Sequence, residues 1–92
     1  MVQMSINWGI LTASQRKTII DSMPKIVKEA ERIRAKAYRK ADMKTSMILN
    51  KPSVYCKLMA CIEVSKGMTE ITLFRFRESN GYDEESIGWI DL

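Results

Sequence analysis

The chain has 92 residues, of which 46% are hydrophobic and 28% charged, with a formal net charge of +4. These values are typical of one globular domain, 1–92, and exclude a disordered chain or two separate cores. No apolar run approaches the ~18 residues of a membrane span, and no targeting or lipidation motif is present, so we expect a soluble cytoplasmic protein with no membrane partner.

The N-terminal half predicts a strand followed by helix. Residues 2–10 alternate between apolar and polar, and Thr12 or Ser14 can cap the helical segment that follows. One helix over 14–44 would be ~46 Å long, against ~30 Å for a globule of this size. Because Pro24 also removes a backbone donor, we predict two helices, 13–21 and 23–43, with Ser22 capping the second.

The C-terminal half predicts strands. After a loop at 50–53, residues 54–64 alternate, a turn follows at 65–67, and residues 69–77 return as a second strand. A polar loop at 78–86 then leads to a short strand at 87–92. The predicted order is β-α-α-β-β-β, an α+β fold in which a long basic helix covers one face of an antiparallel sheet.

One row of basic residues is the main functional signal. Lys25, Lys28, Arg32, Lys36 and Arg39 recur every three or four positions, which places them on one helix face. That face lies about 120° from the apolar arc and is therefore expected to be exposed. Such a row suits a phosphate backbone, although it could also be a plain solvated face or meet an acidic protein. The predicted nucleic-acid or partner-binding residues are Lys25, Lys28, Arg32, Lys36, Arg39, Lys40, Arg75 and Arg77.

The second signal is an apolar sheet face. Alternation in 54–64 and 69–77 places aromatic and apolar residues on both faces of the sheet, and the helix can cover only one. The other is covered by the short helix or by 43–53, or it binds a partner or a second copy. Alternatively, Tyr55 or the phenylalanines stack on bases beside Arg75 and Arg77. The outward residues are Tyr55, Lys57, Met59, Cys61 and Glu63 on the first strand and include Phe74 and Phe76 on the second.

Charge is divided unevenly along the chain. Residues 14–44 hold ten Lys or Arg against four acids, and residues 65–92 hold three against six, which predicts a bipolar molecule. The acidic run at 83–85 could hold a divalent cation or touch basic protein, but it lacks the spacing of a calcium loop.

Catalytic chemistry is not indicated. The chain has no His, its four glycines are scattered, and Cys56 and Cys61 would point to opposite faces of a strand. We therefore predict no enzyme activity, no cofactor, no metal, no disulfide and a reducing compartment.

The chain shares three features with a known class of proteins: its small size, its order of helix and antiparallel strands, and the cationic stretch KEAERIRAKAYRK at 28–40. In these respects the chain resembles phage-encoded anti-CRISPR proteins that act on type I-F surveillance complexes. The resemblance implies a non-enzymatic inhibitor whose partner is a host CRISPR-Cas ribonucleoprotein, meaning Cas subunits and guide RNA, and which contacts guide RNA or blocks target DNA. The alternatives are a stand-alone DNA- or RNA-binding protein and an oligomeric interaction adaptor.

Overall fold

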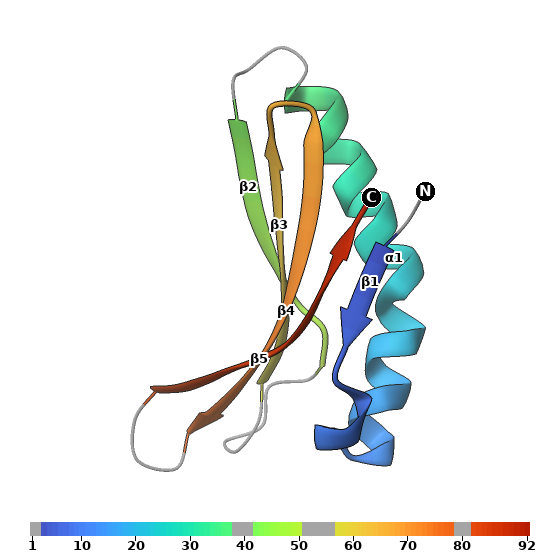
Figure 1. Ribbon diagram of the computed structural model, residues 1–92, viewed down its shortest axis with the longest axis vertical. Coiled ribbons are helices and arrows are strands. Elements are labelled where there is room, and N and C mark those ends of the chain that lie inside the picture. The colour runs from blue at the N-terminus through green and yellow to red at the C-terminus, as the bar shows by residue number, and fades with distance from the viewer. Residues whose placement is uncertain (1–2, 38–41, 51–56, 79–81) are drawn as a thin grey trace.

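The computed structural model describes residues 3–37, 42–50, 57–78 and 82–92. One long helix, α1 (Ala13–Ala37), packs on a five-stranded antiparallel sheet, which confirms the predicted α+β class (Figure 1). The strand order is β1-β5-β4-β3-β2, so that the first and last strands of the chain are neighbours. The strands are β1 (Gln3–Ile6), β2 (Asp42–Ile48), β3 (Lys57–Ser65), β4 (Met68–Glu78) and β5 (Tyr82–Asp91), and a short 3-10 helix, η1, spans Trp8–Ile10.

The core lies between α1 and one face of the sheet. Strand β3 contributes every second residue to it, as its alternation predicted, because successive side chains of a strand point to opposite faces. The helix contributes residues at spacings of three, four and seven, which is the repeat of one helix face. The buried apolar residues are Leu11, Ile19, Ile26, Ala30, Ile33, Leu58, Ala60, Ile62, Val64, Ile71, Leu73, Ile87 and Ile90.

The predicted break at Pro24 is wrong, since α1 continues from Ala13 to Ala37 with Pro24 inside it. Pro24 and Ile20, the residue whose carbonyl loses its partner, are both exposed, so water can bond that carbonyl. Ile19 and Ile26 are fully buried on either side of the proline, and their shared packing outweighs the lost hydrogen bond. The molecule is elongated, 41 × 27 × 18 Å, rather than a globule of ~30 Å, and it therefore accommodates a helix of about 37 Å.

Thr12 caps this single helix. The Gln15 backbone N–H donates to Thr12 Oγ1 at 3.1 Å, while the Thr12 N–H donates to Gln15 Oε1 at 3.0 Å, forming a reciprocal capping box. Ser22 is not a cap, as its hydroxyl donates to the Thr18 carbonyl at 2.6 Å within the helix. The predicted basic residues from Lys25 to Lys36 therefore lie on one continuous helix with a single N-terminal cap.

Three strands, β1, β2 and β5, differ from those predicted from the sequence. Residues 42–48, expected to end a helix and enter a loop, form the edge strand β2, with Met43, Thr45 and Met47 half-buried on the helix side. The expected loop at 78–86 is largely strand, because β5 begins at Tyr82. The first strand is shorter than 2–10, since β1 ends at Ile6 and η1 follows.

The turn at 65–67 is confirmed. Lys66 and Gly67 both have positive φ, 52° and 78°, as the two central residues of a type I′ hairpin require. Cross-strand pairing from Ser65 with Met68 to Lys57 with Phe76 follows without interruption. This register decides which side chains become neighbours on the sheet.

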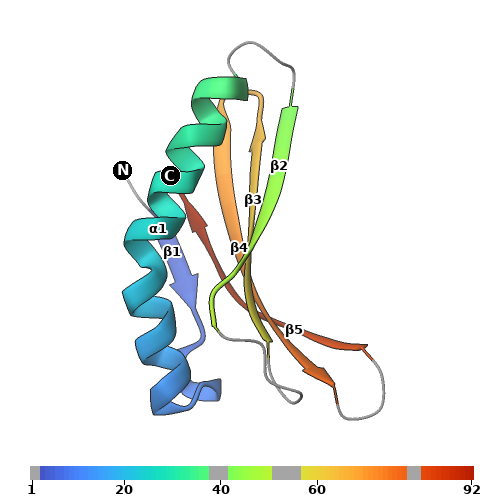
Figure 2. The same cartoon turned by 180° about the vertical axis from the view of Figure 1, so that it is seen from behind.

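The face of the sheet away from α1 is not covered by any described element (Figures 1 and 2). Neither alternative cover was correct, because 13–21 belongs to α1 and 42–48 joins the sheet as β2. We refer to this uncovered side as the open face. It carries Gln3, Ser5, Asp42, Lys44, Ser46, Ile48, Lys57, Met59, Cys61, Glu63, Ser65, Met68, Glu70, Thr72, Phe74, Phe76, Glu84, Ser86, Trp89 and Asp91.

Gly88 is required where β1 meets β5. A Cβ atom at this position would lie 2.2 Å from the Ser5 carbonyl oxygen and 2.8 Å from Ile6 Cα, and both are backbone atoms that cannot rotate away. We predict that Gly88→Ala lowers the free energy of unfolding by at least about 2 kcal/mol, measured by urea denaturation. Gly9→Ala is the matched control, since its Cβ would meet only Asn7 Oδ1 at 3.7 Å. Equal stability of the two variants would contradict this tight pairing.

Candidate nucleic-acid interface

The outer face of α1 carries the predicted basic row. Lys25, Lys28, Arg32 and Lys36 are all exposed, whereas Ile26, Ala30 and Ile33, on the other side of the helix, are buried. We call these four cations the basic stripe. It extends over about 17 Å at 1.5 Å per residue. The remaining members of the predicted row, Arg39 and Lys40, lie outside the described residues.

Within the basic stripe, Arg32 forms an ion pair with Glu29. Arg32 Nε donates to both carboxylate oxygens of Glu29 at 3.0 Å, and its Nη2 also donates to Glu29 Oε1. These hydrogen bonds lower the pKa of Glu29 and raise that of Arg32; the charge of Lys36 also lowers the Glu29 pKa. Lys25, Lys28 and Lys36 form no ion pair with any described residue.

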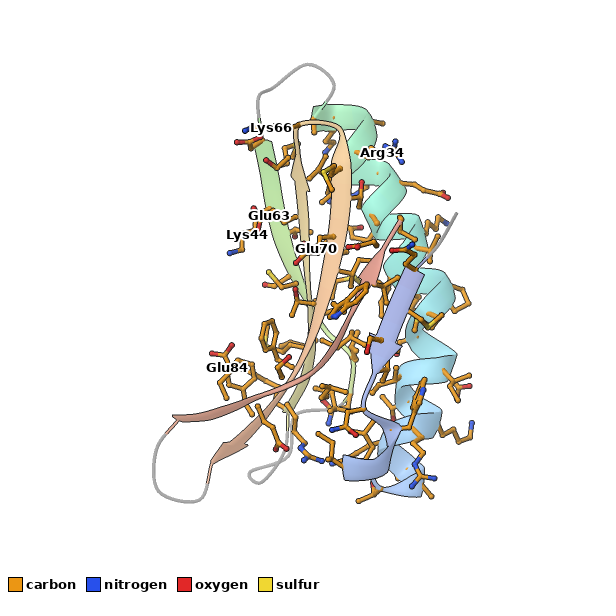
Figure 3. All side chains as sticks on the ribbon, viewed as in Figure 1. Arg34, Lys44, Glu63, Lys66, Glu70 and Glu84 are labelled. Atoms are coloured by element: carbon orange, nitrogen blue, oxygen red, sulfur yellow. The ribbon has the colours of Figure 1, made fainter. Side chains whose placement is uncertain are left out.

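The stripe therefore keeps a strong positive character. An exposed ion pair between residues three apart contributes little to stability, so a phosphate can compete with Glu29 for Arg32. A second exposed pair, Lys17 with Asp21 at 2.7 Å, lies nearer the N-terminus of α1 and raises the pKa of Lys17. Arg34 is also exposed, but it lies on the other flank of α1, where it lines a hollow with Thr69 and Leu92 (Figure 3).

Arg75 does not belong to this surface. Only 2% of Arg75 is exposed, and its guanidinium lies under the start of α1. Nη1 donates to the Ile10 carbonyl at 2.8 Å and to Gln15 Oε1 at 3.0 Å, while Nη2 and Nε donate to Glu85 Oε2 at 2.8 and 3.2 Å. The assignment of Arg75 as a partner-binding residue is therefore a misreading of a structural residue. The backbone of Arg77 lies in β4, and its side chain is outside the described part of the structure.

The aromatic residues are separated from the basic stripe by the sheet itself. Phe74 and Phe76 lie on the open face with ring centroids 6.5 Å apart, and Lys57 Nζ lies 5.9 Å from the centre of Phe76. Phosphate contact on α1 and base stacking on these rings would therefore use opposite faces of the molecule. Tyr55, the other stacking candidate, lies outside the described residues.

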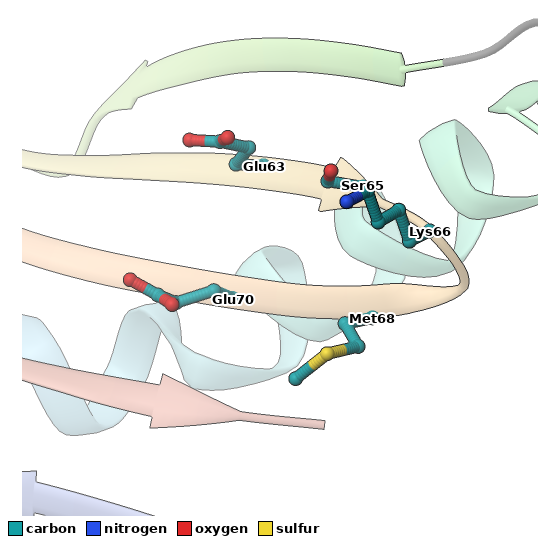
Figure 4. A pocket seen from close by; sticks show the side chains of 5 residues that line it. All are labelled: Glu63, Ser65, Lys66, Met68 and Glu70. Atoms are coloured by element: carbon teal, nitrogen blue, oxygen red, sulfur yellow. The ribbon is translucent and has the colours of Figure 1, made fainter.

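An acidic row on the open face was not anticipated. Cross-strand pairing places Glu63 opposite Glu70, and Glu70 opposite Asp91, with Lys44 next to Glu63 at the edge. Figure 4 shows Glu63 and Glu70 on neighbouring strands near the hairpin, and Figure 3 shows Lys44, Glu63 and Glu84 away from α1. Sequence spacing alone could not reveal the row, because its members come from three strands and meet only through their register.

No metal or cofactor site emerges from the part of the chain that is described. No group of three or more potential ligands among His, Cys, Asp and Glu is close enough to hold an ion there. The run at 83–85 contributes Glu85 to the Arg75 pair rather than to a loop. Cys61 is a half-buried free thiol.

Comparisons with known proteins add no assignment: no family model, curated protein or solved structure matches the chain. No described helix combines the length and apolar character that crossing a membrane requires. The geometry of the basic stripe and the open face is therefore the basis for any functional proposal.

The buried Arg75 and the exposed basic stripe are expected to contribute differently to the free energy of unfolding. We predict that Arg75→Met destabilises the fold by about 2–4 kcal/mol, because it removes buried, charge-assisted hydrogen bonds. Arg32→Gln should leave the free energy of unfolding almost unchanged, since Arg32 is exposed. Chemical denaturation of both variants tests this. Comparable losses would show that the stripe also holds the fold together.

Proposed function

We propose that this chain is a non-enzymatic protein that binds a nucleoprotein complex and contacts the phosphates of its RNA or DNA through the basic stripe. The observation that carries the proposal is the exposure of four cations in one row, three of them without an ion-pair partner among the described residues. An anti-CRISPR-like inhibitor is the specific form that we propose, with a CRISPR-Cas ribonucleoprotein as the partner.

Contact through the stripe alone would be independent of sequence. Lysine and arginine side chains on one exposed helix face neutralise phosphates, whereas sequence is read from base edges or by stacking on exposed rings. Cross-strand pairing with Met59 and Lys57 places Phe74 and Phe76 on the side of the sheet away from α1 and therefore from the stripe. Specificity for a particular complex then comes from protein surfaces outside the stripe.

A salt titration tests the phosphate contact. If all four cations of the basic stripe meet phosphates, the logarithm of the association constant should fall with the logarithm of salt concentration with a slope of about −3.6 on B-form DNA. Fluorescence anisotropy with labelled DNA and RNA of unrelated sequences measures it. Binding that did not weaken with salt would contradict the electrostatic contact.

Charge reversal on the stripe tests its role directly. Arg32→Glu combined with Lys36→Glu should abolish binding to the target complex while leaving the unfolding temperature nearly unchanged, because both residues are exposed. The matched control is Arg34→Glu combined with Lys66→Glu, which makes the same change in charge on exposed residues that do not belong to the stripe. Equal loss of binding in both variants would show that net charge, rather than the stripe, is responsible.

The same measurements separate the inhibitor from a stand-alone nucleic-acid-binding protein. Salt-dependent binding that is much tighter for an assembled type I-F surveillance complex than for naked DNA or RNA is expected of the inhibitor. Salt-dependent binding to naked nucleic acid with no preference for the complex would instead support the alternative. A pull-down from host lysate, with and without nuclease, identifies the partner and shows whether nucleic acid bridges it.

A further inference from the structure

The open face has an apolar region at some distance from the β3–β4 turn. Ile48 of β2 lies opposite Met59 of β3, and Met59 lies opposite Phe74 of β4. Phe76 adjoins this row, and Met59, Cys61 and both phenylalanines line a hollow of about 260 Å³. Ile48 is 51% exposed. An apolar surface of this kind is typical of a contact with another protein.

The end of the open face nearer the β3–β4 turn is acidic. A second hollow, of about 410 Å³, is found there, and Figure 4 shows the side chains that line it. Neither Glu63 nor Glu70, on its two strands, forms an ion pair with a described residue. The lining residues are Glu63, Ser65, Lys66, Met68 and Glu70. The carboxylates at this end of the open face are Asp42, Glu63, Glu70 and Asp91.

Carboxylates outnumber cations over the open face as a whole. With Glu84, the described residues of this face include five carboxylates, against Lys44 and Lys57, which gives a net charge of −3. Lys66 of the turn adds one cation beside it. The open face is therefore expected to repel a second copy of itself and to attract a cationic surface.

The apolar hollow and the acidic hollow have a definite separation along β3. Met59 lines the first and Glu63 lines the second, four residues away, which corresponds to about 14 Å at 3.4 Å per residue. Residues seven and eleven apart on an α-helix lie on the same face, at distances of about 10.5 and 16.5 Å. A long lysine or arginine side chain covers the remaining difference. A helix lying along β3 can therefore contact both hollows from one of its faces.

A helix is also better suited to an uncovered sheet face than a single strand is. The backbone N–H and C=O groups of a helix bond to one another, whereas those of a strand laid on the face would lose water without gaining partners. A helix on the open face would form a third layer opposite α1 (Figure 2).

We propose that the open face binds a basic amphipathic helix of a partner protein. Apolar side chains of that helix contact Met59 and Phe74, and a lysine or arginine on the same helix face lies between Glu63 and Glu70. Burial of apolar surface provides the driving force, and the carboxylates select a cationic helix and fix its direction along the strands. This contact does not rest on the proposed function, because the basic stripe lies on the outer side of α1.

A synthetic helix of defined sequence is the probe. It is an alanine-based peptide of about 18 residues, with two leucines one turn apart and two arginines one turn apart, seven residues farther along on the same face. A peptide of identical composition, with the arginines on the opposite face, is its control. Fluorescence anisotropy should show at least about tenfold tighter binding of the first peptide. Amide chemical shifts should change on β3 and β4 and not along the basic stripe.

Variants of the full chain identify the residues responsible. Glu63→Gln combined with Glu70→Gln should weaken binding of the first peptide at least about tenfold, and Phe74→Ser should weaken it as well. Asp21→Asn combined with Glu31→Gln is the matched control, since it removes two exposed carboxylates from α1 and should leave peptide binding unchanged. Thermal unfolding confirms that each variant is folded.

Charge reversal provides a test by recovery. Glu63→Arg combined with Glu70→Arg should not bind the arginine peptide, but it should bind the peptide in which glutamates replace both arginines. The Glu63→Gln/Glu70→Gln variant should keep the salt dependence of nucleic-acid binding. Loss of nucleic-acid binding by the unaltered chain, with peptide binding intact, would overturn the proposed function alone.

Three outcomes overturn the helix-docking proposal. The first is no binding of the arginine peptide at concentrations up to about 1 mM. The second is equal binding of the two peptides of identical composition, or binding that the Glu63→Gln/Glu70→Gln variant leaves unchanged. The third is a dimer, detected by sedimentation equilibrium, that covers the open face and that the peptide does not dissociate.

Discussion

The buried guanidinium of Arg75 joins the sheet to the start of the helix. It bonds Glu85 on the neighbouring strand, the Ile10 carbonyl and Gln15, whose side chain also accepts from the Thr12 N–H in the capping box. A cation with 2% exposure is stable only when such partners replace its water. These bonds attach the first turn of α1 to Arg75 of β4, while the burial of Ile26, Ala30 and Ile33 sets which face of α1 points outward. The exposure of the basic stripe therefore depends on residues that lie outside it.

Because α1 packs on only one face of the five-stranded sheet, the opposite face is not covered by a second layer of described structure. Among the described residues, that open face carries Phe74, Phe76 and Trp89 together with Glu63, Glu70, Glu84 and Asp91, although Lys44 and Lys57 lie there too. The basic stripe lies on the outer side of α1, so an acidic row and a basic row occupy opposite sides of the molecule. Its acidic side is formed by register, since Glu63 lies far from Asp91 in the sequence.

Local sequence patterns correctly predicted the elements in which neighbouring residues alone determine the structure. The alternation predicted for 54–64 is present in its described part, 57–64, and so are the turn predicted at 65–67 and the exposed stripe. Of the two predicted caps, Thr12 and Ser14, Thr12 is the one that forms. Three features required tertiary information. Pro24 is accommodated because buried residues lie on both sides of it, and β2 was concealed by helical spacing that continues through Ala37 and Ala41. Arg75 was misassigned because alternation places it on a face but does not reveal that Glu85 and the helix start enclose it.

The acidic row places an unfavourable interaction on the open face. Like charges directly opposite across strands are destabilising, by about 0.2–1 kcal/mol for each pair, and Glu70 has such a neighbour on both sides. Lys44 of β2, opposite Glu63, supplies a cation at one end of the row. Departures from local rules tend to occur where a surface serves a partner.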